Sequence, residues 1–259
     1  MGDIVNHFES RSMSDFPTTP RVQRVRHELR RRTLRVQRVE DLSPGMRRIT
    51  LAGAELEGFV SASFDDHVKL IFDAGDAEHA AVMRDYTPRR HDATAGELDI
   101  EFALHGDGPA AAWATQVVPG QPLVVAGPRG SFVIAPDHAW HLLAGDVTAL
   151  PAIARRLEEL PAGTPAIVLL AVAAADRRPL PSQADVALQW FDDDAALLAA
   201  LRQLALPPGE GYAWCAGEAA TMAAARRVLV QERGHPGQSI RAAAYWKRGA
   251  RAHHEHLES

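Results

Sequence analysis

The hydrophobic pattern of the chain changes character near residue 136. Before this point, short segments alternate apolar and polar side chains, which is typical of strands with one buried face. After it, nearly unbroken apolar runs alternate with helical stretches, which is typical of a parallel sheet covered by helices. The pattern therefore predicts two domains of different class, with a boundary within 133–139.

The first half predicts an antiparallel Greek-key β-barrel, because it contains many short strands and a single helical insert. Leu42-Ser43-Pro44-Gly45 is a turn signal between the first two strands. The alternation is cleanest over 97–105. Strands are expected at 33–40, 46–51, 67–72, 81–87, 97–105 and 122–127, and the helix at about 109–118.

The second half predicts a C-terminal α/β domain with a parallel sheet. The run 140–146 is apolar almost throughout, as in a strand buried on both faces. The acids Asp192, Asp193 and Asp194 suit the positive end of a helix dipole. Strands are expected at 140–146, 166–172, 187–191, 211–217 and 239–246, and helices at 148–160, from 192 onward and at 218–234.

These patterns divide the chain into four parts. Residues 1–32 are expected to be a flexible N-terminal segment, rich in arginine over 21–32, with 1–12 resembling an expression leader before Met13. Residues 33–136 form the barrel and 137–250 the α/β domain. Residues 251–259 are interpreted as a flexible tail, in which His253, His254 and His256 do not make a metal site.

Composition narrows the possible partners. The net charge of −5 gives no reason to expect nucleic acid or an anionic membrane as a partner. A single cysteine, Cys215, excludes an internal disulfide and is compatible with a reducing cytoplasm. No apolar run approaches the roughly 18 residues of a membrane span. We therefore expect a cytoplasmic protein with no membrane span and no resident metal, and take a monomer as the simplest state.

Two short stretches of the first domain have the chemistry of a cofactor site. The first, Arg84-Asp85-Tyr86-Thr87-Pro88-Arg89, offers a cation, an aromatic ring and a hydroxyl at the end of a strand. The second, His105-Gly106-Asp107-Gly108-Pro109-Ala110, joins a strand to a helix through glycines. A flavin dinucleotide needs a stacking face, ring hydrogen-bond partners and phosphate ligands, and these stretches supply all three. The alternative for each is ordinary sheet packing or a turn.

The second domain offers a possible nucleotide site but no Gly-x-Gly-x-x-Gly motif. Ligands of open α/β sheets bind at the carboxyl ends of strands, where phosphates face helix N-termini. Ala144-Gly145-Asp146-Val147-Thr148-Ala149 stands at such an end, and Trp214-Cys215-Ala216-Gly217-Glu218-Ala219 is expected beside it. An ordinary strand-to-helix turn, with Thr148 near a helix cap, is the alternative.

The order and spacing of several motifs resemble the siderophore-interacting protein family of FAD-dependent ferric-siderophore reductases. The resemblance covers about 35–249 and rests on Arg84-x-Tyr86-Thr87-x-Arg89, on Leu98-Asp99-Ile100-x-Phe102-x-Leu104-His105-Gly106-Asp107-Gly108-Pro109-Ala110, on Ala126-Gly127-Pro128-Arg129-Gly130-Ser131, on Leu142-Leu143-Ala144-Gly145-Asp146, on Ala216-Gly217-Glu218-Ala219 and on Tyr245-Trp246-Lys247-Arg248-Gly249.

The resemblance implies FAD held between the two domains and NADPH or NADH as electron donor. Tyr86 would lie against the isoalloxazine ring, Thr87 would bond a ring nitrogen, and Arg84 would neutralise the pyrophosphate. His105 and the helix start at Gly108 would complete the phosphate and adenosine contacts. The full set of implied cofactor-binding residues is Arg84, Tyr86, Thr87, Arg89, Leu104, His105, Gly108, Pro109, Ala110, Trp113, Gly145, Asp146, Thr148, Ala149, Tyr245 and Trp246.

The implied substrate is a ferric siderophore, whose iron is reduced and released. The resemblance implies a basic patch near the flavin, and the matching residues are Lys69, Arg129, Lys247 and Arg248; solvated surface cations are the alternative. No catalytic acid, base or nucleophile is required, because the flavin carries the chemistry.

Three positions depart from the family pattern. Val147 and Ala171 stand where acids are usual, and Ala111 where serine is usual. Loss of the two acids leaves room for a flavin- or siderophore-binding protein with little turnover. A related NAD(P)H-flavin oxidoreductase with another electron acceptor is the third hypothesis.

Arg177 and Arg178 are candidates for recognising the 2′-phosphate of NADPH.

Overall fold

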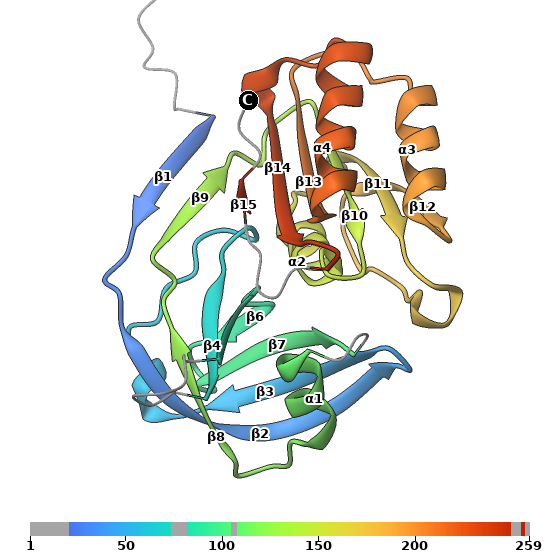
Figure 1. The fold of residues 1–259 in the computed structure, drawn as a ribbon. Helices are drawn as coiled ribbons and strands as arrows, with labels where there is room; N and C mark the ends of the chain where they lie inside the picture. Colours follow the sequence, from blue (N-terminus) through green and yellow to red (C-terminus); the bar gives the residue numbers. More distant parts are fainter. Residues whose placement is uncertain (1–20, 74–81, 105–107, 250–254, 257–259) are drawn as a thin grey trace, which may run out of the picture.

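The computed structural model describes residues 21–73, 82–104, 108–249 and 255–256. In Figure 1 a curled antiparallel sheet lies below a helix-covered parallel sheet, which confirms the expected order of two fold classes. None of the helices in these residues has the length and apolarity needed to cross a membrane.

The first domain is a seven-stranded antiparallel sheet in the order β5-β4-β8-β2-β3-β7-β6. Its core contains Leu34, Ile49, Leu70, Leu98 and Val125, which come from five strands. The elements are β2 (Arg31–Ser43), β3 (Met46–Ala52), η1 (Ala54–Leu56), β4 (Val68–Asp73), β5 (Val82–Tyr86), β6 (Arg90–Asp92), β7 (Glu97–Ala103), α1 (Pro109–Gln116) and β8 (Pro122–Ala126).

The second domain is a six-stranded sheet in the order β12-β11-β10-β13-β14-β15, parallel except for its last strand. All seven residues of β10 are buried, as the apolar run predicts. The elements are β10 (Trp140–Asp146), α2 (Leu150–Glu159), β11 (Pro165–Ala171), η2 (Ala174–Asp176), β12 (Asp185–Phe191), α3 (Asp194–Gln203), β13 (Gly211–Glu218), α4 (Ala219–Arg227), η3 (Val228–Glu232), η4 (Gly237–Ser239), β14 (Ile240–Trp246) and β15 (Glu255–His256).

Helices cover both faces of this parallel sheet. One apolar cluster joins Leu150, Ile153 and Leu157 of α2 to one face, and another joins Leu197 of α3 and Met222 of α4 to the other. Asp193 caps α3 by accepting a hydrogen bond from the Ala196 N–H at 2.8 Å, which agrees with the expected acidic helix start. The arrangement places the carboxyl ends of β10 and β13 toward the curled sheet (Figure 1).

The expectation of a flexible segment needs correction for residues 21–32. β1 (Val22–Arg26) pairs antiparallel with β9 (Gly130–Ile134), and β2 already begins at Arg31. The structure therefore contains a separate two-stranded ribbon, running alongside both domains in Figure 1. Val22 packs against the α/β core, so the segment has a buried face that its arginines conceal in the sequence. Residues 1–20 lie outside the described part.

The tail expectation needs a similar correction only for Glu255 and His256, because β15 pairs with Ala244 and Ala243 of β14. Residues 251–254 and 257–259 lie outside the described part.

Polar contacts fix the two domains against each other. The Arg155 guanidinium on α2 donates to the Ser61 and Pro88 carbonyls of the first domain at 3.0 and 2.8 Å. The Trp214 indole N–H donates to buried Asp65 at 2.8 Å. The Asp176 carboxylate accepts from the Gly45 N–H at 2.7 Å in the β2–β3 turn. Side chains facing the seam thus have defined positions in both domains.

Candidate functional site

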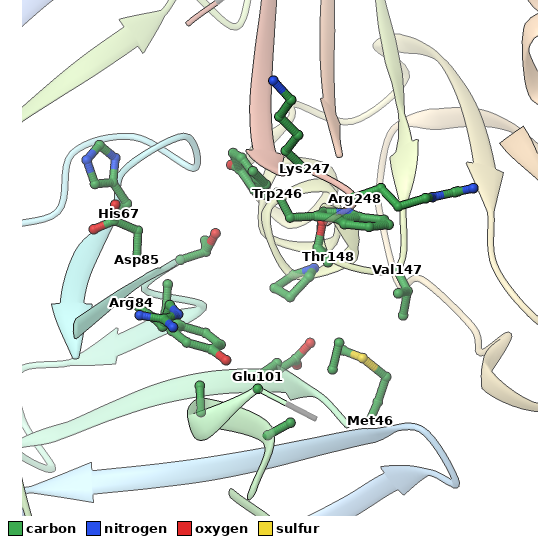
Figure 2. Close-up of a pocket in the computed structure, with 18 of the residues that line it drawn as sticks. Met46, His67, Arg84, Asp85, Glu101, Val147, Thr148, Trp246, Lys247 and Arg248 are labelled. Carbon is green, nitrogen blue, oxygen red and sulfur yellow. The ribbon is translucent and has the colours of Figure 1, made fainter. Parts of the chain in front are cut away.

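A cavity of about 550 Å³ lies at the seam between the two domains. In Figure 2, Met46 and Glu101 of the curled sheet lie across from Trp246, the last residue of β14, while the Lys247 side chain, just after the strand, extends away from the curled sheet. The lining residues are Met46, His67, Arg84, Asp85, Tyr86, Thr87, Glu101, Ala103, Gly108, Ala110, Ala111, Val147, Thr148, Pro151, Tyr245, Trp246, Lys247, Arg248 and Gly249.

The end of β5 supplies an aromatic face and a cation. Tyr86 is half-buried and its ring lies 4.4 Å from that of Phe102, centroid to centroid, so the barrel core supports one side of it. Burial raises the pKa of Tyr86 above its ordinary value, which keeps the phenol neutral. The Arg84 guanidinium donates to the Met83 carbonyl at 2.7 Å and pairs with no carboxylate among the described residues. Its charge is therefore available to an anion in the cavity.

Helix α1 begins at the cavity. Gly108 is the N-cap with Pro109 as first helical residue, and the first helical hydrogen bond runs from the Ala112 N–H to the Gly108 carbonyl at 3.0 Å. By helix geometry, the preceding N–H groups of Ala110 and Ala111 have no partner within the helix. Both residues line the cavity, so two backbone donors and the positive end of the helix dipole are directed toward it.

Asp146 supports this cavity from behind rather than lining it. Its buried carboxylate accepts hydrogen bonds from the Thr148 N–H at 2.8 Å, the Thr148 hydroxyl at 2.5 Å, the Glu218 N–H at 3.0 Å and the Trp246 indole N–H at 2.8 Å. Burial raises the pKa of Asp146, and the Thr148 and Trp246 bonds oppose that rise. The carboxylate thereby orients two side chains that do line the cavity.

Glu218 fixes the segment after β14 in a similar way. Its carboxylate caps α4 by accepting from the Ala220 and Thr221 N–H groups at 2.7 and 3.1 Å. It also accepts from the Arg248 backbone N–H at 3.2 Å. The main chain that carries Lys247 and Arg248 is therefore anchored to the end of the parallel sheet.

Glu101 forms a buried charge cluster on the barrel side of the cavity. Its side chain has no solvent exposure and lies 2.7 Å from a nitrogen of Arg48 and 3.6 Å from one of Arg89. Arg178 of the α/β domain also pairs with it. Three guanidinium groups from three segments thus converge on one carboxylate.

Ten residues expected at the site do line the cavity: Arg84, Tyr86, Thr87, Gly108, Ala110, Thr148, Tyr245, Trp246, Lys247 and Arg248.

Other expected residues lie just outside it. Arg89 is buried and pairs with Glu158 at 2.8 Å, while Trp113 packs into the barrel core beside Phe72 and Phe102. Leu104 also packs against that core, and Pro109 is an exposed helix residue. Gly145 is confined between the Ala216 carbonyl and buried Ala149, where a Cβ atom would approach within 2.3 Å of that oxygen. These residues lie behind or beside the walls of the seam cavity. His105 lies outside the described part of the chain.

The four expected substrate-binding cations divide into two pairs. Lys247 and Arg248 line the cavity, whereas Lys69 is paired with Asp85 at 2.9 Å and Arg129 is exposed on the turn before β9.

Nine lining residues are not among the expected cofactor- or substrate-binding residues, although Asp85, Ala111, Val147 and Gly249 stand in the motifs: Met46, His67, Asp85, Glu101, Ala103, Ala111, Val147, Pro151 and Gly249. Glu101 lies on the polar face of an alternating strand, which ordinarily faces solvent. Only the packing of the second domain converts that face into a cavity wall, so no local signal in the strand identifies it.

A curled antiparallel sheet, a parallel α/β domain and an aromatic, cationic cavity at their seam define the ferredoxin-reductase-like class of FAD- and nicotinamide-binding proteins. Family models narrow this class. Residues 35–82 and 73–132 match the siderophore-interacting FAD-binding domain, and 138–249 match the siderophore-interacting protein model. The chain belongs to the siderophore-interacting protein family.

Individual relatives cover nearly the whole chain. It is 40% identical to the NADPH-dependent ferric-chelate reductase of Escherichia coli K12, over 90% of this chain and 99% of that protein. It is 33% identical to the ferric vibriobactin reductase ViuB of Vibrio cholerae, over 86% and 93%. The crystal structure of a siderophore utilization protein from T. fusca superposes with a TM-score of 0.82 at 34% identity, covering 92% of this chain and all of that one.

Proposed function

We propose that this protein is an FAD-dependent ferric-siderophore reductase that uses NADPH to reduce chelated Fe(III) to Fe(II) and thereby release iron. The observation that carries the proposal is the seam cavity of a chain of this family, which joins an aromatic face, a helix N-terminus and cations that form no salt bridge with the described residues. Relatives named as an NADPH-dependent ferric-chelate reductase and a ferric vibriobactin reductase support the same reaction.

The residues at the cavity fit a flavin dinucleotide. The volume of about 550 Å³ lies in the range of ligand pockets. Tyr86 would offer its ring to the flavin, because its other side rests on Phe102. Arg84 and the N-terminus of α1 would hold the pyrophosphate. When bound, FAD supplies the redox chemistry, accepting a hydride from NADPH and giving up electrons one at a time to Fe(III).

The nicotinamide would enter from the α/β side of the seam. Thr148 and Val147 follow β10, at the edge where ligands of parallel sheets bind. Val147 gives this wall an apolar side chain, so the dihydronicotinamide ring would meet no carboxylate there. Trp246, held by Asp146, would limit how the ring approaches.

The candidates for 2′-phosphate recognition are both engaged. Arg177 donates to the Val172 carbonyl at 3.0 Å and pairs with Asp192, while Arg178 pairs with Glu101. Arg177 is the better candidate, because its partner Asp192 is exposed and such a pair exchanges readily with solvent.

Lys247 and Arg248 would attract the ferric chelate, since catecholate and related chelates are often anionic. Both line the cavity, so the chelate would approach within electron-transfer range of the flavin. Lys69 would contribute less, because Asp85 neutralises its charge. A cytoplasmic location and a monomeric state complete the proposal.

The test is an anaerobic absorbance experiment on the FAD-loaded protein. NADPH should bleach the flavin, and a ferric siderophore should restore its absorbance while a ferrous-iron indicator forms its coloured complex. Flavin that NADPH fails to bleach would favour a binding protein with little turnover. Bleaching that oxygen or a protein acceptor reverses, but a ferric siderophore does not, would favour an oxidoreductase with another acceptor.

A further inference from the structure

A second hollow, of about 300 Å³, lies where the chain passes from β1 to β2. It shares no lining residue with the cofactor cavity. Three arginines, one histidine and one glutamate are among its lining residues, so the arginines outnumber the carboxylate and the walls carry excess positive charge. The lining residues are Arg26, His27, Glu28, Arg30, Arg32, Gly58, Val60, Gly127 and Pro128.

Arg32 gives this hollow a buried cation, which the nearby carboxylates Glu28 and Glu55 attract without forming a salt bridge in the described part of the chain. The residue is 4% exposed, and its guanidinium donates to the Glu55 carbonyl at 2.9 Å and to the Gly127 carbonyl at 3.1 Å. It also lies 5.2 Å from the Phe59 ring centroid. Among the described residues no carboxylate pairs with it. A guanidinium has five N–H donors, so donors beyond these two bonds remain for a ligand.

Arg30 adds a second cation to the lining of the hollow. A Cβ atom at Gly58 would lie 4.0 Å from its Nη1 atom, which places the guanidinium over this glycine. Its only carboxylate partner in the described chain is Glu28, at 2.8 Å, and the two side chains are 54% and 72% exposed. Such an exposed pair contributes little and yields readily to a competing anion. Burial, and then repulsion by Arg30, lower the pKa of Arg32, while Glu28 and Glu55 partly oppose the shift.

We propose that this hollow binds an oxyanion, the phosphate or carboxylate group of a small molecule, between Arg32 and Arg30. The planar guanidinium fork matches both groups, and burial of one fork strengthens its hydrogen bonds. The anion would relieve the repulsion between the two arginines and complete the donors of Arg32. The site goes beyond the reductase function, because none of its residues belongs to the cofactor cavity.

Glu28 acts as an internal competitor for this anion. Its carboxylate occupies Arg30 when the site is empty and must leave, or share, that guanidinium when an anion binds. Removal of its charge should therefore strengthen anion binding. The opposite effects expected at positions 28 and 30 separate a defined site from general attraction to a basic surface.

The experiment is calorimetric titration of the FAD-loaded protein with inorganic phosphate and, separately, with citrate. Bound FAD keeps both probes out of the pyrophosphate site. Arg30→Ala should lower the affinity for the tighter-binding probe at least fivefold, and Glu28→Gln should raise that affinity at least twofold. Arg31→Ala is the matched control, because Arg31 is exposed, carries the same charge and does not line the hollow. Its affinity should stay within twofold of the parent. Arg32 is left intact, because its two carbonyl bonds also support the fold.

Preference for phosphate or for citrate identifies the ligand group, and either supports the site. The proposal is overturned if neither phosphate nor citrate binds at concentrations on the order of 10 mM, because a dissociation constant weaker than this would not indicate a specific site. It is also overturned if Arg31→Ala weakens binding as much as Arg30→Ala, since that result indicates diffuse attraction. Binding that Arg30→Ala and Glu28→Gln leave unchanged places the anion elsewhere and rejects the hollow.

Discussion

The indole N–H of Trp246 donates a 2.8 Å hydrogen bond to the carboxylate of Asp146, 100 residues earlier in the chain. This bond joins the ends of β14 and β10, which are not adjacent in the sheet because β13 lies between them. A cavity-lining aromatic ring is thereby fixed by a residue that does not itself line the cavity. The site depends on this support as much as on the residues that would touch the cofactor.

Asp146→Asn should lower the free energy of unfolding by about 1–3 kcal/mol. An amide in place of the carboxylate directs N–H groups at a position that now receives four hydrogen bonds, so a buried donor loses its partner. Urea denaturation measures the change. Trp246→Phe is the control, because it removes only one of the four donors and should cost less. Equal stability of Asp146→Asn and the parent would contradict this role.

Glu101→Gln should lower the free energy of unfolding by more than Asp146→Asn does, by about 3–5 kcal/mol. Removal of this charge leaves Arg48, Arg89 and Arg178 without their shared counter-ion at the seam. Glu158→Gln is the matched control, because Glu158 also pairs with Arg89 but is 43% exposed, and its loss should cost under about 1 kcal/mol. Denaturant unfolding of both variants tests the difference. A smaller loss of unfolding free energy for Glu101→Gln than for Glu158→Gln would contradict the role of Glu101 as the main counter-ion of these arginines.

The sequence predicted local structure better than the surroundings of individual side chains. The alternation of apolar and polar residues in β7 and the unbroken apolar run of β10 are patterns within single strands. They were sufficient to locate both strands. β6 has three residues, too few for a periodic signal, and the half-buried valines of β1 stand among arginines in the sequence. Gly145 and Asp146 are expected at the cofactor site, and the structure adds surroundings that the motif does not reveal: Gly145 is tightly packed, and the Asp146 carboxylate accepts four internal hydrogen bonds. Such contacts depend on segments about 70 to 100 residues away, beyond any local pattern.

His141 should contribute a loss of stability as the pH decreases from about 6.5 to about 4. Burial, followed by nearby Arg156, lowers the pKa of His141 from 6.5 to about 4. The unfolded chain therefore binds a proton at this histidine in a pH range where the folded chain does not, and protonation favours unfolding. The difference corresponds to at most about 3 kcal/mol. Unfolding free energies measured across this range test the prediction.

His141→Gln should flatten that part of the pH dependence. Glutamine can still donate a hydrogen bond toward the Pro136 carbonyl, which the His141 ring contacts at 3.1 Å. It has no proton to gain, so the slope between these pH values should decrease. An unchanged slope would assign the acid sensitivity to other groups, of which His138 and His235 also have lowered pKa values through burial.

Arg248→Ala should raise the KM for a ferric siderophore by about tenfold, the equivalent of one lost charge-assisted contact. Lys69→Ala should raise it less, because Lys69 is already paired with Asp85. The rate at which NADPH bleaches the flavin is the internal comparison. Equal losses in bleaching and in siderophore reoxidation would reject a separate substrate patch at Arg248.

A crystal structure of the protein soaked with FAD tests the proposed cofactor site without an intermediate assay. We expect the isoalloxazine ring in the seam cavity against Tyr86, with the pyrophosphate between Arg84 and the start of α1. An empty seam in crystals that contain FAD, or a flavin bound away from Tyr86, would contradict it.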